Sequence, residues 1–195
     1  MRKRTPAAQL AAVRQIQMPF LDVRSATTSY ENYISAVGRA IAVCQNFEAC
    51  AHHVMVVWEI TQNNNRQLEF DELRSIALAL RNVALGGATR RLSDADDFGA
   101  DHAEVLERGR IARNWLAHES TILIDVKGDI RDDFVSHLRE FREHDKYLCD
   151  ADATLAAASY EIQDRELVRT ESQESYARRV EAWVLEPIWP WLESA

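Results

Sequence analysis

Basic side chains gather in one short stretch, residues 108–118, which reads RGRIARNWLAH. It holds three arginines and no acidic residue, although the whole chain has a formal net charge of −8. Arg113 and His118 lie five residues apart in it, and Asn114 directly follows the arginine. Histidine titrates near neutral pH and can act as a general base, while arginine offers a fixed fork of donors to an anion. The stretch is therefore the first candidate for a site that combines proton transfer with stabilisation of negative charge.

The run R-N-W-L-A-H at residues 113–118 resembles the R-(polar)-x-x-x-H signature of the HEPN family. Asn114 after the arginine and Ala117 before the histidine both fit the preferences of that family. Its members are helical bundles, and many are metal-independent ribonucleases of toxin and antiviral-defence systems. The resemblance implies an endoribonuclease with Arg113 and His118 as catalytic residues, RNA as substrate, and neither a cofactor nor a metal. It also implies a cognate antitoxin protein as a further partner.

The chemistry of RNA cleavage fits these two residue types. Histidine would remove the proton of the ribose 2′-hydroxyl, and arginine would stabilise the charge of the phosphorane. Five residues of α-helix rotate by about 500°, which leaves the two side chains about 140° apart. Arg113 and His118 therefore converge only if the helix ends or unwinds near Ala117, or if a second subunit supplies one of them. The resemblance implies the second arrangement, a composite site in a homodimer, where Asn114 would position the phosphate or hold the tautomer of His118.

The same spacing occurs at Arg139 and His144, and a looser version at Arg131 and His137. Arg139 is followed by a glutamate and stands among alternating charges, where pairing between residues four apart on a helix explains it. Two other functions stay open: a non-catalytic HEPN-like module that binds nucleotide, RNA or a protein partner, and a helical adaptor without a site. Ser120 occupies the position where some toxins of the family carry a modified tyrosine, so that regulation is not expected.

Glu48 interrupts an apolar helical pattern, between Cys44 and Ala51. A buried carboxylate needs a partner. Arg113 is the expected partner, which would make Glu48 a supporting residue of the site, and His52 is the alternative. The pattern could also pass through the neighbouring Phe47, which would leave Glu48 in solvent.

Two further groups invite a functional interpretation. A thiol and an imidazole at Cys50 and His53 could share a zinc ion, but no second pair of ligands has metal-site spacing, so no metal is expected. The tail at 183–192, WVLEPIWPWL, holds three of the five tryptophans. Because no basic residue interleaves with them, packing in the core or in a dimer interface is expected rather than stacking on bases.

The elements that must position these residues are helices. The predicted fold is all-α, a single domain over 1–195 with flexible residues 1–6. It is an antiparallel bundle of four to five long helices plus a short N-terminal helix. Glycine and proline are few, six and four residues, which leaves room for long helices. Helices are expected over 7–17, 30 to about 63–65, 70–85 (ended by Gly86-Gly87), 101 to about 116, 130 to beyond 147 with a break near 149–150, and 173–185, with 121–129 as a connector.

Charge and composition exclude several classes of protein. Residues 1–124 hold 14 Lys and Arg against 14 Asp and Glu, and residues 125–195 hold 9 against 17. A basic face for duplex DNA is therefore not expected. Three cysteines without repeated spacing argue against a secreted disulfide scaffold. No apolar run approaches the length of a membrane helix and no signal peptide is evident, so a cytoplasmic location is expected.

Overall fold

The computed structural model describes residues 26–63, 69–80, 83–94, 100–120, 130–164 and 167–193. These ranges contain helices and no strand, so the predicted all-α fold is confirmed. None of the described helices combines the length and the apolar character needed to cross a membrane. The expected N-terminal helix at 7–17, the flexible residues 1–6 and the connector at 121–129 lie outside the described residues.

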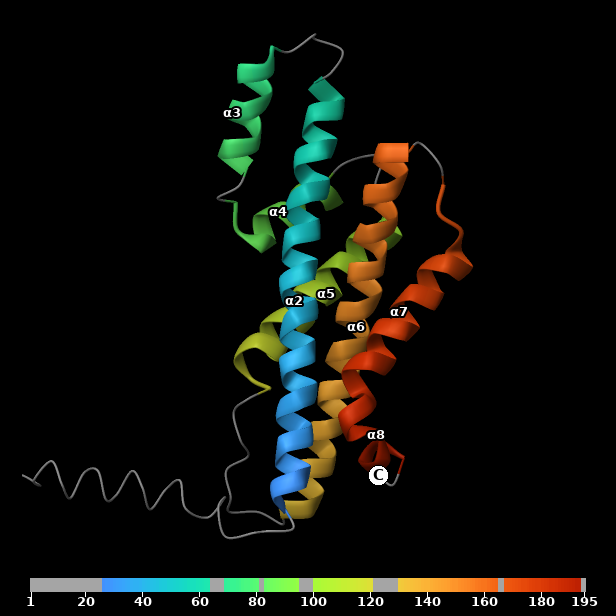
Figure 1. The fold of residues 1–195 in the computed structure, drawn as a ribbon. Helices are drawn as coiled ribbons and strands as arrows, with labels where there is room; N and C mark the ends of the chain where they lie inside the picture. The colour runs from blue at the N-terminus through green and yellow to red at the C-terminus, as the bar shows by residue number, and fades with distance from the viewer. Residues whose placement is uncertain are drawn as a thin grey trace, which may run out of the picture.

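Four of the described helices are long and form a bundle. They are α2 (Ala26–Asn63), α5 (Ala100–His118), α6 (Ile130–Asp164) and α7 (Thr170–Leu185). The shorter elements are α3 (Phe70–Leu80), α4 (Leu85–Ser93), the 3-10 turn η4 (Glu186–Ile188) and α8 (Trp189–Leu192). Figure 1 shows α2 and α6 lying side by side along the length of the molecule, with α7 beside α6.

The two longest helices run in the same direction. Tyr33 contacts His137 near one end of α2, and His53 contacts Gln163 near its other end. Because the residue numbers rise together, α2 and α6 are parallel. α5 and α7 run the opposite way (Figure 1), so successive long helices alternate in direction.

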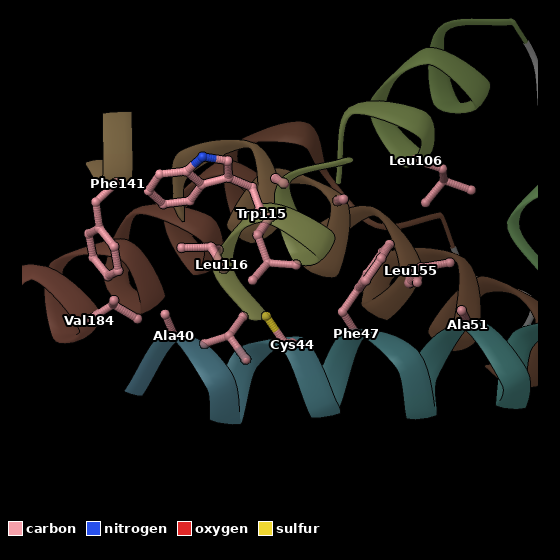
Figure 2. Close-up of a cluster of buried hydrophobic side chains, with 14 of the residues drawn as sticks. Ala40, Cys44, Phe47, Ala51, Leu106, Trp115, Leu116, Phe141, Leu155 and Val184 are labelled. Atoms are coloured by element: carbon pink, nitrogen blue, oxygen red, sulfur yellow. The ribbon is translucent and has the colours of Figure 1, made fainter. Parts of the chain in front are cut away.

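One apolar core fills the space between the long helices. Phe47 of α2, Leu116 of α5 and Leu155 of α6 are fully buried in it. In Figure 2, Cys44 and Phe47 point from α2 toward side chains of α5 and α6. The core thereby fixes which face of α5 is turned inward.

Gly109 lies where α5 crosses α6. A Cβ atom placed on this residue would overlap the Cβ of Ala151 on α6, and it would lie 3.4 Å from the ring of Phe47. The backbones of the two helices can approach this closely only because position 109 carries no side chain. The contact at Gly109 thereby fixes the position of α5, and with it Arg113, along the axis of the bundle.

The prediction of one helix over 70–85 is wrong about where that helix ends. α3 ends at Leu80, and a separate helix, α4, begins at Leu85. Gly86 and Gly87, which were expected to end a helix, lie in the first turn of α4 instead. A Cβ on Gly87 would approach Cγ1 of Val83 to 2.8 Å. These glycines therefore allow a tight turn between two helices. From the sequence alone, such a turn cannot be told apart from the simple end of one helix.

The expected break near 149–150 is also wrong, because α6 continues without interruption to Asp164. Cys149 and Ala151 are buried, and the hydroxyl of Thr154 donates to the carbonyl of Asp150 at 2.9 Å, one turn earlier. The alanines that follow have the highest helix propensity of any residue. Tertiary packing and propensity thus carry the helix through the polar positions.

Candidate functional site

The motif lies on an uninterrupted helical segment. α5 extends through His118, and the amide of Glu119 still donates to the carbonyl of Trp115 at 2.7 Å. The helix therefore does not unwind before His118, and it ends there, one residue after Ala117. In helical geometry Arg113 and His118 remain about 140° apart around the axis. A single chain does not bring these two residues together.

Arg113 lies at the boundary between core and solvent. Its side chain is 24% exposed, and its guanidinium Nη2 forms an ion pair with Oε1 of Glu48 on α2. Nη1 donates to Oδ1 of Asn114 at 3.2 Å. The predicted pairing of Arg113 with Glu48 is therefore confirmed, and it fixes the guanidinium against α2.

Glu48 is not the buried carboxylate that its position in the pattern suggested. The apolar stripe of α2 passes through Phe47, which is fully buried, while the side chain of Glu48 is 30% exposed. His52, the alternative partner, has Nε2 2.5 Å from the carbonyl oxygen of Val83, to which it donates. It thus ties α2 to the segment before α4 and takes no part at Arg113.

The motif helix turns its polar residues outward. Trp115 and Leu116 are buried and point into the core (Figure 2). Asn114 and His118, on the other side of the helix, are exposed. The chain therefore presents an amide and an imidazole to solvent, while Arg113 lies on the side of α5 that faces Glu48 of α2.

The competing histidines take part in packing. The rings of His137 and His144 lie against Trp115, with centroids 5.4 and 4.5 Å from its ring. Nε2 of His137 is 2.6 Å from the hydroxyl of Tyr33. Burial lowers the pKa of His144, which favours the neutral ring. Both residues hold α6 against α5, whereas His118 is exposed.

The cysteines are not arranged for nucleophilic or metal chemistry. Burial raises the pKa of Cys44 to about 12, although the nearby charge of Arg113 acts to lower it. Burial also raises the pKa values of Cys50 and Cys149. A protonated thiol is a poor nucleophile and a poor metal ligand. Within the described part of the chain, no three His, Cys, Asp or Glu side chains are grouped to hold a metal ion.

The expected packing of the tryptophan-rich tail in the core is found in part, because Trp191 packs against the core and its ring centroid lies 6.2 Å from that of Phe134. Trp183 and Trp189 are largely exposed, and arginines from other helices cover them. The guanidinium of Arg39 lies 5.3 Å from the ring centroid of Trp183, and that of Arg142 lies 5.8 Å from that of Trp189. Basic residues thus do lie beside these rings in the fold, although none interleaves with them in the sequence. The tail enters the core through its aliphatic residues, Val184, Leu185 and Ile188.

Two buried carboxylates on α6 were missed from the sequence. Asp152 accepts hydrogen bonds from Asn46 at 2.8 Å and from Tyr176 at 2.9 Å, and so joins three helices. Asp145 is fully buried, and its Oδ1 has only the thiol of Cys149 nearby, at 3.9 Å. Its Oδ2 has no hydrogen-bond partner among the described residues. The one feature of the sequence that could have indicated their burial is their spacing of seven residues, which places both on the apolar side of the helix.

Asp145→Asn should raise the melting temperature at pH 8. Burial, aided by the charge of Glu181, raises the pKa of Asp145 well above its ordinary value near 3.8. The fold therefore favours the protonated acid, so stability falls as the pH rises from the ordinary pKa toward the raised one. The neutral amide avoids this loss, and we expect a gain of about 1–2 kcal/mol at pH 8 that vanishes near pH 4.

Thermal melts of Asp145→Asn at both pH values check this prediction. Glu140→Gln, at an exposed position of the same helix, is the control and should show no such pH-dependent gain. A stabilisation of equal size at pH 4 and pH 8 would contradict the assignment.

The chemistry available on α5 depends on its own residues. Arg113 can bind negative charge, and the imidazole of His118 is exposed, but the helix turns them in different directions within one chain. Compared with protein-family models, curated proteins and solved structures, the chain gives no match.

Proposed function

We propose that this chain is a HEPN-like, metal-independent endoribonuclease whose site combines Arg113 of one copy with His118 of a second. The supporting observation is the geometry of α5. It stays helical through His118, presents that histidine and Asn114 to solvent, and turns Arg113 toward Glu48 of α2, away from His118 of the same chain. A second copy of α5 is the simplest source of the histidine that each Arg113 lacks.

Each residue has a defined role in the proposed cleavage. His118 removes the proton of the ribose 2′-hydroxyl, and the resulting oxygen attacks the adjacent phosphorus. The bond from phosphorus to the 5′-oxygen breaks, and that oxygen takes a proton from water. The products are a 2′,3′-cyclic phosphate and a 5′-hydroxyl. Arg113 stabilises the charge of the phosphorane, Glu48 orients its guanidinium, and Asn114 contacts the phosphate or fixes the tautomer of His118.

An exposed apolar residue supports pairing of two copies at this surface. Ile111 is 50% exposed, and it lies three residues before Asn114 and seven before His118. These spacings place all three on one face of α5. Contact between two such faces would bury Ile111 and bring each His118 to the other copy.

The cellular setting is proposed from the resemblance alone. A HEPN-like ribonuclease of this kind would act as a toxin or as an antiviral-defence effector. In the first case an antitoxin protein would restrain it, by a means other than modification of a tyrosine, since Ser120 stands at that position.

A non-catalytic HEPN-like module is the second candidate function. The ion pair with Glu48 favours it, because part of the guanidinium of Arg113 is already engaged. Such a module would bind nucleotide, RNA or a protein partner without cleaving. An adaptor without any site would be favoured by an Arg113 that is both paired to an acid and closed off from solvent. Arg113 is paired with Glu48, but its side chain is 24% exposed, so only the first condition is met.

Incubation with single-stranded RNA in the presence of EDTA distinguishes the two candidates. The wild-type chain should produce fragments that end in a 2′,3′-cyclic phosphate, and His118→Ala should produce none above background. His53→Ala, which removes an exposed histidine of α2, is the matched control and should cleave as the wild type does. RNA that stays intact with wild-type protein would leave the non-catalytic module as the function.

A further inference from the structure

A groove of about 390 Å³ lies between α4 and α5, away from the packed core. Its volume falls within the range of small-ligand sites, roughly 300–1,000 Å³. Arg90 and Ser93 line it from α4, and Glu107 and Arg110 line it from α5. The two arginines are twenty residues apart in the sequence, and the packing of α4 against α5 brings them to one groove.

The groove has two cations and one acid. Arg110 donates to Glu107 through Nε at 2.8 Å and through Nη2 at 2.6 Å. These hydrogen bonds, together with the charges of Arg110 and Arg90, lower the pKa of Glu107. Glu107 is therefore ionised at neutral pH, and the groove keeps one positive charge in excess.

The pair of Glu107 with Arg110 can be replaced by an incoming anion. The two residues are three apart on one helix, and the carboxylate is exposed. Exposed pairs of this kind contribute little to stability. A phosphate group is tetrahedral, but any two of its oxygens can accept a bidentate pair of hydrogen bonds from arginine, with more charge than a carboxylate.

The surroundings of the two arginines also suit a phosphate. The hydroxyl of Ser93 can donate a hydrogen bond to it. Gly86 carries no side chain, and a Cβ atom there would touch Cδ of Arg110 at 3.7 Å, so the stem of the arginine lies directly against α4. The guanidinium is thus held at the mouth of the groove by packing of its stem.

We propose that the groove between α4 and α5 binds a phosphate group through Arg90 and Arg110, with Glu107 occupying the site until the phosphate displaces it. The phosphate belongs either to an RNA backbone or to a small phosphorylated molecule. This site does not require cleavage at His118. With RNA as the ligand, Arg110 would hold the strand one helical turn from Arg113, about 5 Å along the axis.

Isothermal titration of the full-length protein with tripolyphosphate tests the site. Arg90→Ala and Arg110→Ala should each weaken binding by about tenfold or more, because each removes a charge-assisted contact. Glu107→Gln should tighten it by roughly threefold to tenfold, because the competing carboxylate is removed. Arg108→Ala is the matched control. Arg108 belongs to the same helix and pairs with Glu104 outside the groove, so affinity should stay within about twofold.

The same variants titrated with a short fluorescent RNA distinguish the two sources of phosphate. A parallel change in RNA affinity assigns the groove to a nucleic-acid backbone. A response to tripolyphosphate alone assigns it to a small phosphorylated molecule, and either result supports the phosphate site. Absence of tripolyphosphate binding to both the wild type and Glu107→Gln would overturn the proposal, as would binding that Arg90→Ala and Arg110→Ala leave unchanged. RNA cleavage is measured separately, so its failure leaves this result intact.

Discussion

A mixture of Arg113→Ala and His118→Ala proteins should cleave RNA, although neither variant cleaves alone. Each variant should lose about 100-fold or more, the usual contribution of a positioned general base or its electrostatic partner. If one copy supplies the arginine and the other the histidine, a mixed dimer has one intact site and one doubly altered site. Random exchange of subunits makes half of the dimers mixed, so about a quarter of wild-type activity should return. Initial cleavage rates after prolonged mixing check this value.

A double variant makes the control for this experiment. Arg113→Ala/His118→Ala mixed with either single variant produces no intact site, so activity should stay at background. Exchange of subunits is shown independently by recovery of an untagged copy with a tagged one. Exchange of subunits without recovered activity would contradict the composite site. The non-catalytic module would then be the better supported function of the chain.

Gly109→Ala should lower the free energy of unfolding by about 1–3 kcal/mol, the usual cost of overpacking a core. Helix propensity alone predicts the opposite, a gain of about 1 kcal/mol for alanine over glycine. The expected sign follows from the overlap between the new methyl group and the Cβ of Ala151, which forces α5 away from α6. Urea denaturation followed by circular dichroism measures the change.

Two further variants separate packing from propensity. Gly38 lies in the middle of α2, with no atom within 4 Å of the place where a Cβ would stand. Gly38→Ala should therefore stabilise the protein by about 0.5–1 kcal/mol. Adding Ala151→Gly to Gly109→Ala should recover part of the lost stability, because it removes the overlapping atom. A Gly109→Ala protein as stable as Gly38→Ala would mean that the two helices do not pack at this point.

The parts of the fold that the sequence predicted were those carried by local pattern. The motif helix was expected over 101–116 and is found as Ala100–His118, within the usual scatter of helix ends. The pair of Glu48 with Arg113 was also predictable, because an acid beside an apolar stripe requires a cation. The sequence left the burial of Glu48 open between two alternatives. The structure shows the one in which the apolar stripe passes through Phe47 and Glu48 keeps contact with solvent.

The parts that the sequence could not predict depend on contacts between distant segments. A pair of glycines such as Gly86 and Gly87 is found both at the end of a helix and at the start of one. The short distance from Gly87 to Val83, which shows that here they belong to the start of α4, is known only from the structure. The groove of Arg90 and Arg110 depends on the packing of α4 against α5, so the sequence did not predict it either. In the sequence, Asp145 does not differ from the exposed charged residues around it. Its burial follows from the packing of α6 against the other helices.

The parallel contact between α2 and α6 has a consequence for synthesis of the protein. Asn46 and Asp152, which join these helices, are 106 residues apart in the chain. A ribosome adding roughly 5–20 residues per second needs about 5–20 seconds to cover that distance. During this interval the apolar face of α2 has been made and its main cover has not. A nascent chain released before Asp164 would therefore expose Phe47 and its neighbours, and would be a substrate for chaperones and proteases.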